Sequence, residues 1–134
     1  DLQLPLHVAV EHDASSTLIQ KLLVHHPEAA AVSCSGGRLP LHLAMYCNAD
    51  NAVAISALLV EAFPGAIEQG DGLGNLPLHL AVEAGNEAAI GFLLAHAPQT
   101  LTRTNNWNQT PRDIAVLRKA TQNIMNLLEI APAP

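Results

Sequence analysis

Aromatic residues are almost missing from this sequence of 134 residues, which contains two Phe, one Tyr and one Trp. Hydrophobic residues nevertheless make up 49% of the chain. Their mass is therefore mostly Ala, Leu, Val and Ile. Strands favour aromatic and β-branched residues, whereas Leu and Ala are strong helix formers. The composition favours closely packed helices over a sheet.

Cysteine and long apolar runs are also scarce. Two cysteines, Cys34 and Cys47, are too few for a disulfide framework, and we expect a reducing, intracellular compartment. No apolar run approaches the roughly 20 residues of a membrane-spanning helix, so we expect no direct membrane insertion. The chain shows no signal peptide. It begins within a motif without an initiator Met, and we expect it to be part of a longer protein.

Basic residues are the third scarcity, with six Lys and Arg against twelve Asp and Glu, for a net charge of −6. This balance argues against a nucleic-acid partner, which usually meets a basic surface. The charge is uneven: residues 1–98 carry ten acids and two bases (−8), and residues 99–134 carry two acids and four bases (+2). An ordinary solvated surface explains this asymmetry, and a weakly polarised partner surface is the alternative.

An internal repeat is the strongest feature of the chain. The phrase LPLHVAV at 4–10 returns as LPLHLAM at 39–45 and LPLHLAV at 76–82, and a degenerate copy, TPRDIAV, stands at 110–116. A second phrase follows each copy, with Ile and a Leu-Leu pair at i, i+3 and i+4, the spacing of one apolar helical face. The sequence therefore predicts four units, each with two helices.

The first helix of each unit begins at a proline, which is well tolerated in the first helical turn. The first helices are predicted at about Pro5–His12, Pro40–Cys47, Pro77–Ala84 and Pro111–Lys119, and the second helices at about Ser16–His25, Val53–Phe63, Glu87–Ala95 and Gln122–Ile130. The expected N-caps are Ser15, Asn51, Asn86 and Thr121. Prolines at 27, 64 and 98 are expected to stop the second helices. The linking turns hold Gly37, Gly74 and Asn108, residue types that tolerate positive φ.

These units resemble ankyrin repeats, whose usual phrase is Thr-Pro-Leu-His with a period near 33 residues. The resemblance implies an all-α ankyrin-repeat solenoid, in which helix-turn-helix units alternate with extended, β-turn or hairpin-like connections. We expect a single domain over residues 1–134, with repeats at about 4–38, 39–75, 76–109 and 110–131. Leu4, Leu39 and Leu76 replace the family's Thr. The first unit lacks a polar outer face, and we expect upstream sequence or another protein to cover it.

Seven histidines invite a metal or catalytic interpretation, but their pattern argues for structural roles. His7, His42 and His79 recur at one repeat position, and the resemblance implies that each bonds the backbone of the neighbouring turn. They stand one repeat apart, too far to share an ion at Zn–N distances of about 2.0–2.1 Å. No CxxC, HExxH, nucleophile-elbow or phosphate-loop spacing occurs. We therefore expect no catalytic site, no cofactor and no metal, and no enzyme activity.

The resemblance also implies where a partner binds, namely on the turn tips and the exposed side of the first helices. We call this surface the concave face. Trp, Tyr and Arg, the types enriched in binding hot spots, fall among its positions. We expect it to bind another protein of unknown identity, the alternative being a structural subunit built into a large multiprotein assembly. The expected contact residues are Gln3, Glu11, His12, Ser35, Arg38, Tyr46, Cys47, Leu73, Asn75, Glu83, Asn106, Trp107, Gln109, Leu117 and Arg118.

Overall fold

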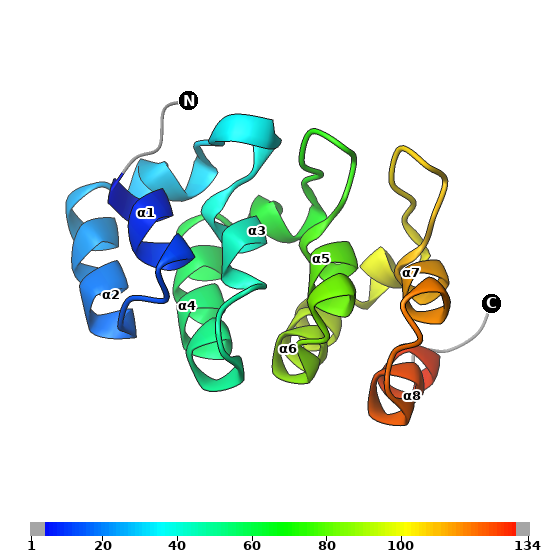
Figure 1. Ribbon diagram of the computed structural model, residues 1–134. Coiled ribbons are helices and arrows are strands. Elements are labelled where there is room, and N and C mark those ends of the chain that lie inside the picture. The colour runs from blue at the N-terminus through cyan, green and yellow to red at the C-terminus, as the bar shows by residue number, and fades with distance from the viewer. Residues whose placement is uncertain (1–4, 131–134) are drawn as a thin grey trace.

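A computed structural model describes residues 5–130, apart from the side chains of residues 35, 49, 50, 129 and 130. Over this range the chain forms eight α-helices in four consecutive pairs and no strand, so the predicted all-α fold of repeated helix pairs is confirmed. Figure 1 shows the pairs side by side in one row, with the linking turns projecting together from one edge. The pairs are α1 (Pro5–Glu11) with α2 (Ser16–His25), α3 (Pro40–Ala44) with α4 (Ala49–Ala62), α5 (Pro77–Ala84) with α6 (Glu87–His96), and α7 (Pro111–Leu117) with α8 (Gln122–Ile130).

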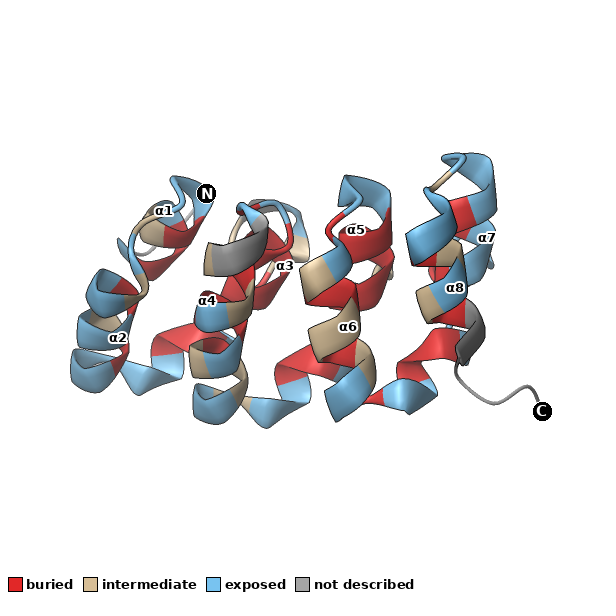
Figure 2. Ribbon diagram, turned by 90° about the horizontal axis from the view of Figure 1, so that it is seen from below, coloured by how far each residue is buried: buried red, intermediate tan, exposed pale blue. Residues whose placement is uncertain are grey.

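The hydrophobic core runs along the row between the first and second helices. The isoleucine that opens each second-helix phrase is fully or almost fully buried, at positions 19, 55, 90 and 124. Buried residues line the inward sides of the helices, and exposed ones lie on the outer turns (Figure 2). One helix pair cannot bury its apolar stripe alone, so the contacts between neighbouring pairs supply the core.

The motif histidines tie each first helix to the next linking turn. His42 is fully buried, and its Nδ1 accepts the backbone N–H of Leu39 at 2.9 Å. Nε2 therefore carries the proton, and it donates to the carbonyls of Gln69 at 3.0 Å and Asn75 at 3.1 Å. His79 repeats the arrangement with the N–H of Leu76 and the Gln109 carbonyl. The imidazole thus accepts the N–H of the N-cap residue, as the Asp113 carboxylate does for Thr110 in the fourth unit.

The linking turns have the positive φ angles that their residues predict. Gly37, Gly74 and Asn108 have φ values of 71°, 77° and 61°. Neighbouring turns are hydrogen-bonded to each other: the Gly72 N–H donates to the Gly36 carbonyl at 2.7 Å, and the Asn106 N–H donates to the Leu73 carbonyl at 3.0 Å. The tips of the second, third and fourth units therefore form one hydrogen-bonded row.

The prolines after the second helices begin short 3₁₀ helices, which the sequence interpretation missed. Each proline stands at the first position of such a helix, where its absent N–H leaves no bond unmade. Each of these second helices ends two residues before the proline, and the chain turns into the 3₁₀ segment without an extended stretch. These helices span Pro27–Ala31, Pro64–Glu68 and Pro98–Thr102, and a shorter one spans Ser35–Gly37.

The second unit departs furthest from the predicted boundaries. Helix α3 ends at Ala44, three residues before the predicted end, and α4 begins at Ala49, one turn before the predicted start. The cap of α4 is Asn48, whose Oδ1 accepts the N–H of Asn51 at 3.1 Å. The prediction that Asn51 caps this helix is therefore wrong. Its amide donates instead to the Asp13 and Ala14 carbonyls of the preceding loop, at 3.3 and 2.8 Å.

Candidate functional site

The expected contact residues are distributed over the turn tips and the first helices. Gln3 lies outside the described residues, and the side chain of Ser35 is not described. Most of the others have exposed or half-buried side chains on this surface: Glu11, His12, Arg38, Tyr46, Leu73, Asn75, Glu83, Asn106, Trp107, Gln109, Leu117 and Arg118.

Cys47 does not fit the expectation of a contact residue. It is buried, with 8% of its surface exposed, and its Sγ donates to the carbonyl of Val10 at 3.2 Å. Burial raises the pKa of this thiol to about 12. The side chain therefore joins the loop after α3 to α1 inside the stack, and it leaves the set of candidate contacts.

Large apolar side chains are exposed on the same surface. Trp107 is 60% exposed, Leu117 66%, and Tyr46 and Leu73 47% each. Val116 is 61% exposed for another reason, because its equivalents Val10 and Val82 are buried against the next unit and the structure describes no unit after the fourth. Exposed apolar groups gathered in one place are typical of interaction sites, whereas single ones are normal on any surface.

Glu83 on α5 links the second unit to the fourth. Its Oε1 accepts the hydroxyl hydrogen of Tyr46 at 3.1 Å, and its Oε2 accepts from Nη2 of Arg118 at 2.8 Å. Burial, and then the charge of Glu83, raise the pKa of Tyr46 to about 12. The phenol therefore remains a donor at neutral pH, and the three side chains form one fixed group.

Arg38 extends this group towards the second turn. Its guanidinium carbon lies 6.0 Å from the centre of the Tyr46 ring, within reach of a cation–π interaction. Its Nε lies 4.0 Å from Oδ2 of Asp71, a carboxylate whose side chain is 2% exposed. The polar chain from Asp71 to Arg118 thus spans three units and holds Tyr46 in place.

A small cavity of about 150 Å³ lies where α5, α7 and the last two turns meet. Six of its lining residues were expected contacts, and the sequence interpretation missed Asn105 and Ile114. Asn105 could have been found from its register, since it occupies the place of Asp71 one repeat later. The cavity is lined by Asn75, Glu83, Asn105, Trp107, Gln109, Ile114, Leu117 and Arg118.

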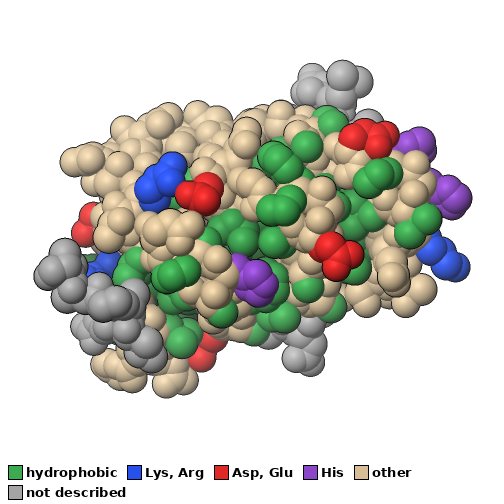
Figure 3. All heavy atoms as spheres, turned by 180° about the vertical axis from the view of Figure 1, so that it is seen from behind, with side chains coloured by type: hydrophobic (Ala, Val, Ile, Leu, Met, Phe, Trp, Pro, Cys, Tyr) green, Lys and Arg blue, Asp and Glu red, His purple; other side chains and the backbone are tan. Residues whose placement is uncertain are grey.

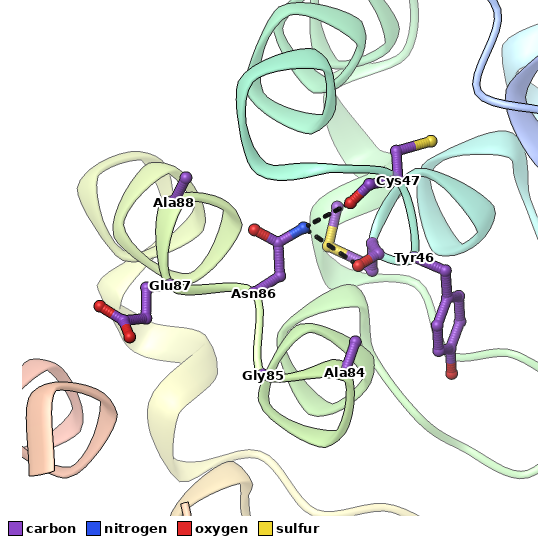
Figure 4. A pocket seen from close by; sticks show the side chains of 8 residues that line it. Tyr46, Cys47, Ala84, Gly85, Asn86, Glu87 and Ala88 are labelled. Carbon is purple, nitrogen blue, oxygen red and sulfur yellow. Dashed lines mark hydrogen bonds between the residues drawn. The ribbon is translucent and has the colours of Figure 1, made fainter. Parts of the chain in front are cut away.

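A larger and more open hollow of about 640 Å³ lies between the loops that follow α3 and α5. The Asn86 amide reaches across it and donates to the carbonyls of Met45 and Cys47, both at 3.2 Å, as the dashed lines in Figure 4 show. Glu87 and Tyr46 point away from this amide in opposite directions (Figure 4). The donors of Asn86 are therefore used in holding two units together, which makes the hollow a weaker candidate for a binding site.

Across residues 5–130, no three His, Cys, Asp or Glu side chains gather as metal ligands would. Within the same range, no helix has both the length and the apolarity needed to cross a membrane.

Comparison with known proteins agrees with the helix pairs. Residues 73–105, from the tip of the third turn through α5 and α6, match the family model of the ankyrin repeat. No curated protein matches the chain. Ankyrin repeats serve generally as protein-interaction modules and not as enzymes. Residues 73–105 are similar to an ankyrin repeat, and the other three helix pairs are in register with that repeat, each with a first helix opened by proline and two of them with the buried histidine; these findings support the ankyrin-repeat family.

Proposed function

We propose that this protein binds another protein through its concave face, and that it has no enzyme activity of its own. The observation that carries the proposal is the gathering of Trp107, Leu117 and Tyr46, each about half exposed or more, around the Glu83–Arg118 pair. Large aromatic side chains and arginines dominate the energetics of protein interfaces. The proposed contact set is the expected one without Cys47.

The polar group beneath these side chains supports the proposal through rigidity. Tyr46 is held by Glu83 and lies beneath Arg38, so it loses little freedom when a partner covers it. The backbone N–H of Trp107 donates to Oδ1 of Asn105 at 3.0 Å, which fixes the backbone from which the Trp107 side chain projects. Contact residues that are positioned before binding reduce the entropy cost of association.

The proposal is tested by capturing partners with the full-length protein and then mapping the contact by hydrogen exchange. In the complex, backbone amides around Trp107 and Leu73 and along α5 and α7 are expected to exchange more slowly. The 3₁₀ helix Pro64–Glu68, on the opposite side, is expected to be unchanged. Protection confined to the second helices and the 3₁₀ helices would contradict the proposal.

A second candidate function, a structural subunit of a large assembly, is favoured by the apolar rear and end of the stack. Hydrophobic side chains gather on the face seen in Figure 3. A cavity of about 270 Å³ opens at the first unit, and its walls are mostly apolar. Slower exchange at this cavity in the complex would support the second function. It is lined by Pro5, Leu6, Leu22, His26, Glu28, Ala29 and Val32.

A further inference from the structure

The cavity between α5, α7 and the last two turns is organised by one buried amide. Asn105 is 7% exposed. Its Oδ1 accepts two backbone N–H groups, those of Trp107 and Gln109, both at 3.0 Å. Because backbone N–H groups can only donate, this atom must be the oxygen and the other must be the amide nitrogen. The orientation of Asn105 is therefore fixed by the backbone.

The orientation of Asn105 sets the orientation of two further amides. Its Nδ2 donates to Oδ1 of Asn75 at 2.9 Å and to Oε1 of Gln109 at 3.1 Å. Both amides must therefore turn their oxygens towards Asn105 and their NH2 groups away from it. Among the described residues, no acceptor is paired with Nδ2 of Asn75 or Nε2 of Gln109. Two amide donors are thus presented at the cavity that these residues line.

The backbones of the two donor residues are also held in place. The carbonyl of Asn75 accepts from Nε2 of His42, and the carbonyl of Gln109 accepts from Nε2 of His79 at 2.9 Å. Each donor residue is thus tied to a buried histidine as well as to Asn105. A donor pair fixed in this way costs little entropy to engage.

The charge of the cavity selects among possible acceptors. Arg118 and Glu83 are the charged residues in its lining, and they pair at 2.8 Å, so the lining has no net charge. Both oxygens of Glu83 already accept hydrogen bonds, from Tyr46 and Arg118. Because Glu83 offsets the charge of Arg118, the cavity offers a carboxylate no net attraction to repay its desolvation, whereas a neutral carbonyl costs less to desolvate. Trp107, Ile114 and Leu117 form the apolar part of a mainly polar lining and can cover a small aliphatic group.

From this arrangement, and on the basis of the proposed function, we infer that the cavity binds an uncharged stretch of an extended partner segment. The amides of Asn75 and Gln109 donate to its carbonyl oxygens, and an apolar side chain of the segment packs on Trp107 and Leu117. Asn75 and Gln109 are then specificity-determining residues. The partner chemistry is a peptide with carbonyl acceptors and an apolar anchor, without an acidic group at this position.

The test uses short linear peptides selected by display on the full chain and retained if their binding weakens with Trp107→Ala. Asn75→Asp and Gln109→Glu keep the oxygen that accepts from Asn105 and replace the outward NH2 with an acceptor. Each is expected to weaken binding at least tenfold. Gln20→Glu, an added charge on the exposed side of α2, is the matched control and is expected to bind as the wild type does. Gln109→Ala, which removes the donor without adding charge, is expected to weaken binding as well.

The outcomes separate this inference from the proposed function. If Trp107→Ala weakens binding while Asn75→Asp, Gln109→Glu and Gln109→Ala all bind like the wild type, the donor assignment is wrong and the concave face remains the binding surface. The inference would also be overturned if the selected peptides share an acidic residue and their binding is lost in the Arg118→Gln variant. If no selected peptide depends on Trp107 or Tyr46, the proposed function itself fails and this inference fails with it.

Discussion

His42 and His79 act as structural residues because they are neutral. Burial lowers the pKa of His42 and of His79 below the ordinary value of 6.5. In the unfolded chain these groups take up protons near pH 6.5, whereas the folded chain resists protonation until lower pH. Between those two pH values the unfolded state binds more protons, so the free energy of unfolding falls as pH falls.

We therefore predict that urea unfolding midpoints decrease from pH 7.5 to about pH 5 and that His79→Asn makes the decrease smaller. Asn at this position has no titrating group, and its amide oxygen can still accept the N–H of Leu76. The measurement is the free energy of unfolding against pH for both proteins. Parallel pH profiles for the two would contradict this role of His79.

Ser56 carries a polar group that the core does not need. Ser56 is fully buried in α4, and among the described residues its hydroxyl has no hydrogen-bond partner. An unpaired buried polar group costs about 1–3 kcal/mol. We predict that Ser56→Ala raises the free energy of unfolding by about 1 kcal/mol in a urea titration. Ser15→Ala is the contrasting change: it removes the cap of α2 and should lower stability. A loss of stability in Ser56→Ala would show that the hydroxyl has a partner.

At the scale of the helix pair, Asn86 joins two elements with one side chain. Its Oδ1 caps α6 by accepting the N–H of Ala89 at 3.2 Å, while its Nδ2 satisfies carbonyls at the end of α3 and in the following loop. Those carbonyls need a side-chain donor because the second unit has no glycine there to reverse the chain. In the third unit Gly85 does so, with a φ of 72°.

Asn86→Asp separates the two roles, since it keeps the capping oxygen and removes the donor. We predict a loss of about 2–4 kcal/mol, because two buried carbonyls lose their donor and then face a carboxylate. Ser15→Asp, which exchanges one capping side chain for another on α2, is expected to change stability by less than about 0.5 kcal/mol. Equal effects of both changes in chemical denaturation would mean that the bridge to α3 contributes nothing.

The contact between neighbouring turn tips leads to a second prediction at the scale of the helix pair. A Cβ on Gly74 would lie 2.4 Å from Oδ1 and 2.9 Å from N of Asn106, at a φ of 77°. Gly85 has a similar φ of 72° but open space around it. Gly85→Ala should therefore cost only the left-handed backbone penalty of about 1–2 kcal/mol. Gly74→Ala should cost clearly more, measured as the difference in free energy of unfolding, and an equal cost would show that the contact between tips is unimportant.

Most helix boundaries could be predicted from the repeat, and the exceptions have local physical causes. The bounds of α2, α5 and α8 match the expected ones because each has a clear proline, cap or glycine at its ends. The cap of α4 was misplaced because both Asn48 and Asn51 suit an N-cap, and the choice depends on Asp13, which is distant in sequence and accepts from both amides at 2.7 and 2.6 Å. A local pattern carries no information on that contact.

The candidate site remains a prediction, and the sequence could not show how its residues are connected. Family register placed Tyr46, Trp107 and Arg118 on one surface. It could not show that Glu83 connects Tyr46 to Arg118, because that contact depends on side-chain reach between units 35 and 37 residues apart. The role of Asn105 was missed for a related reason, since a buried amide and an exposed one look alike in sequence.

At the scale of the whole molecule, the central claim is that the concave face binds a partner protein. The most direct measurement is a titration of the captured partner with the wild-type protein and with Trp107→Ala, Tyr46→Ala and Val24→Ala. Val24 is 72% exposed on α2 and serves as the matched control. Trp107→Ala and Tyr46→Ala are each predicted to weaken binding by about 1–3 kcal/mol without unfolding the stack, while Val24→Ala leaves the affinity unchanged. Unchanged affinity for both aromatic variants, with a loss for Val24→Ala, would contradict the claim.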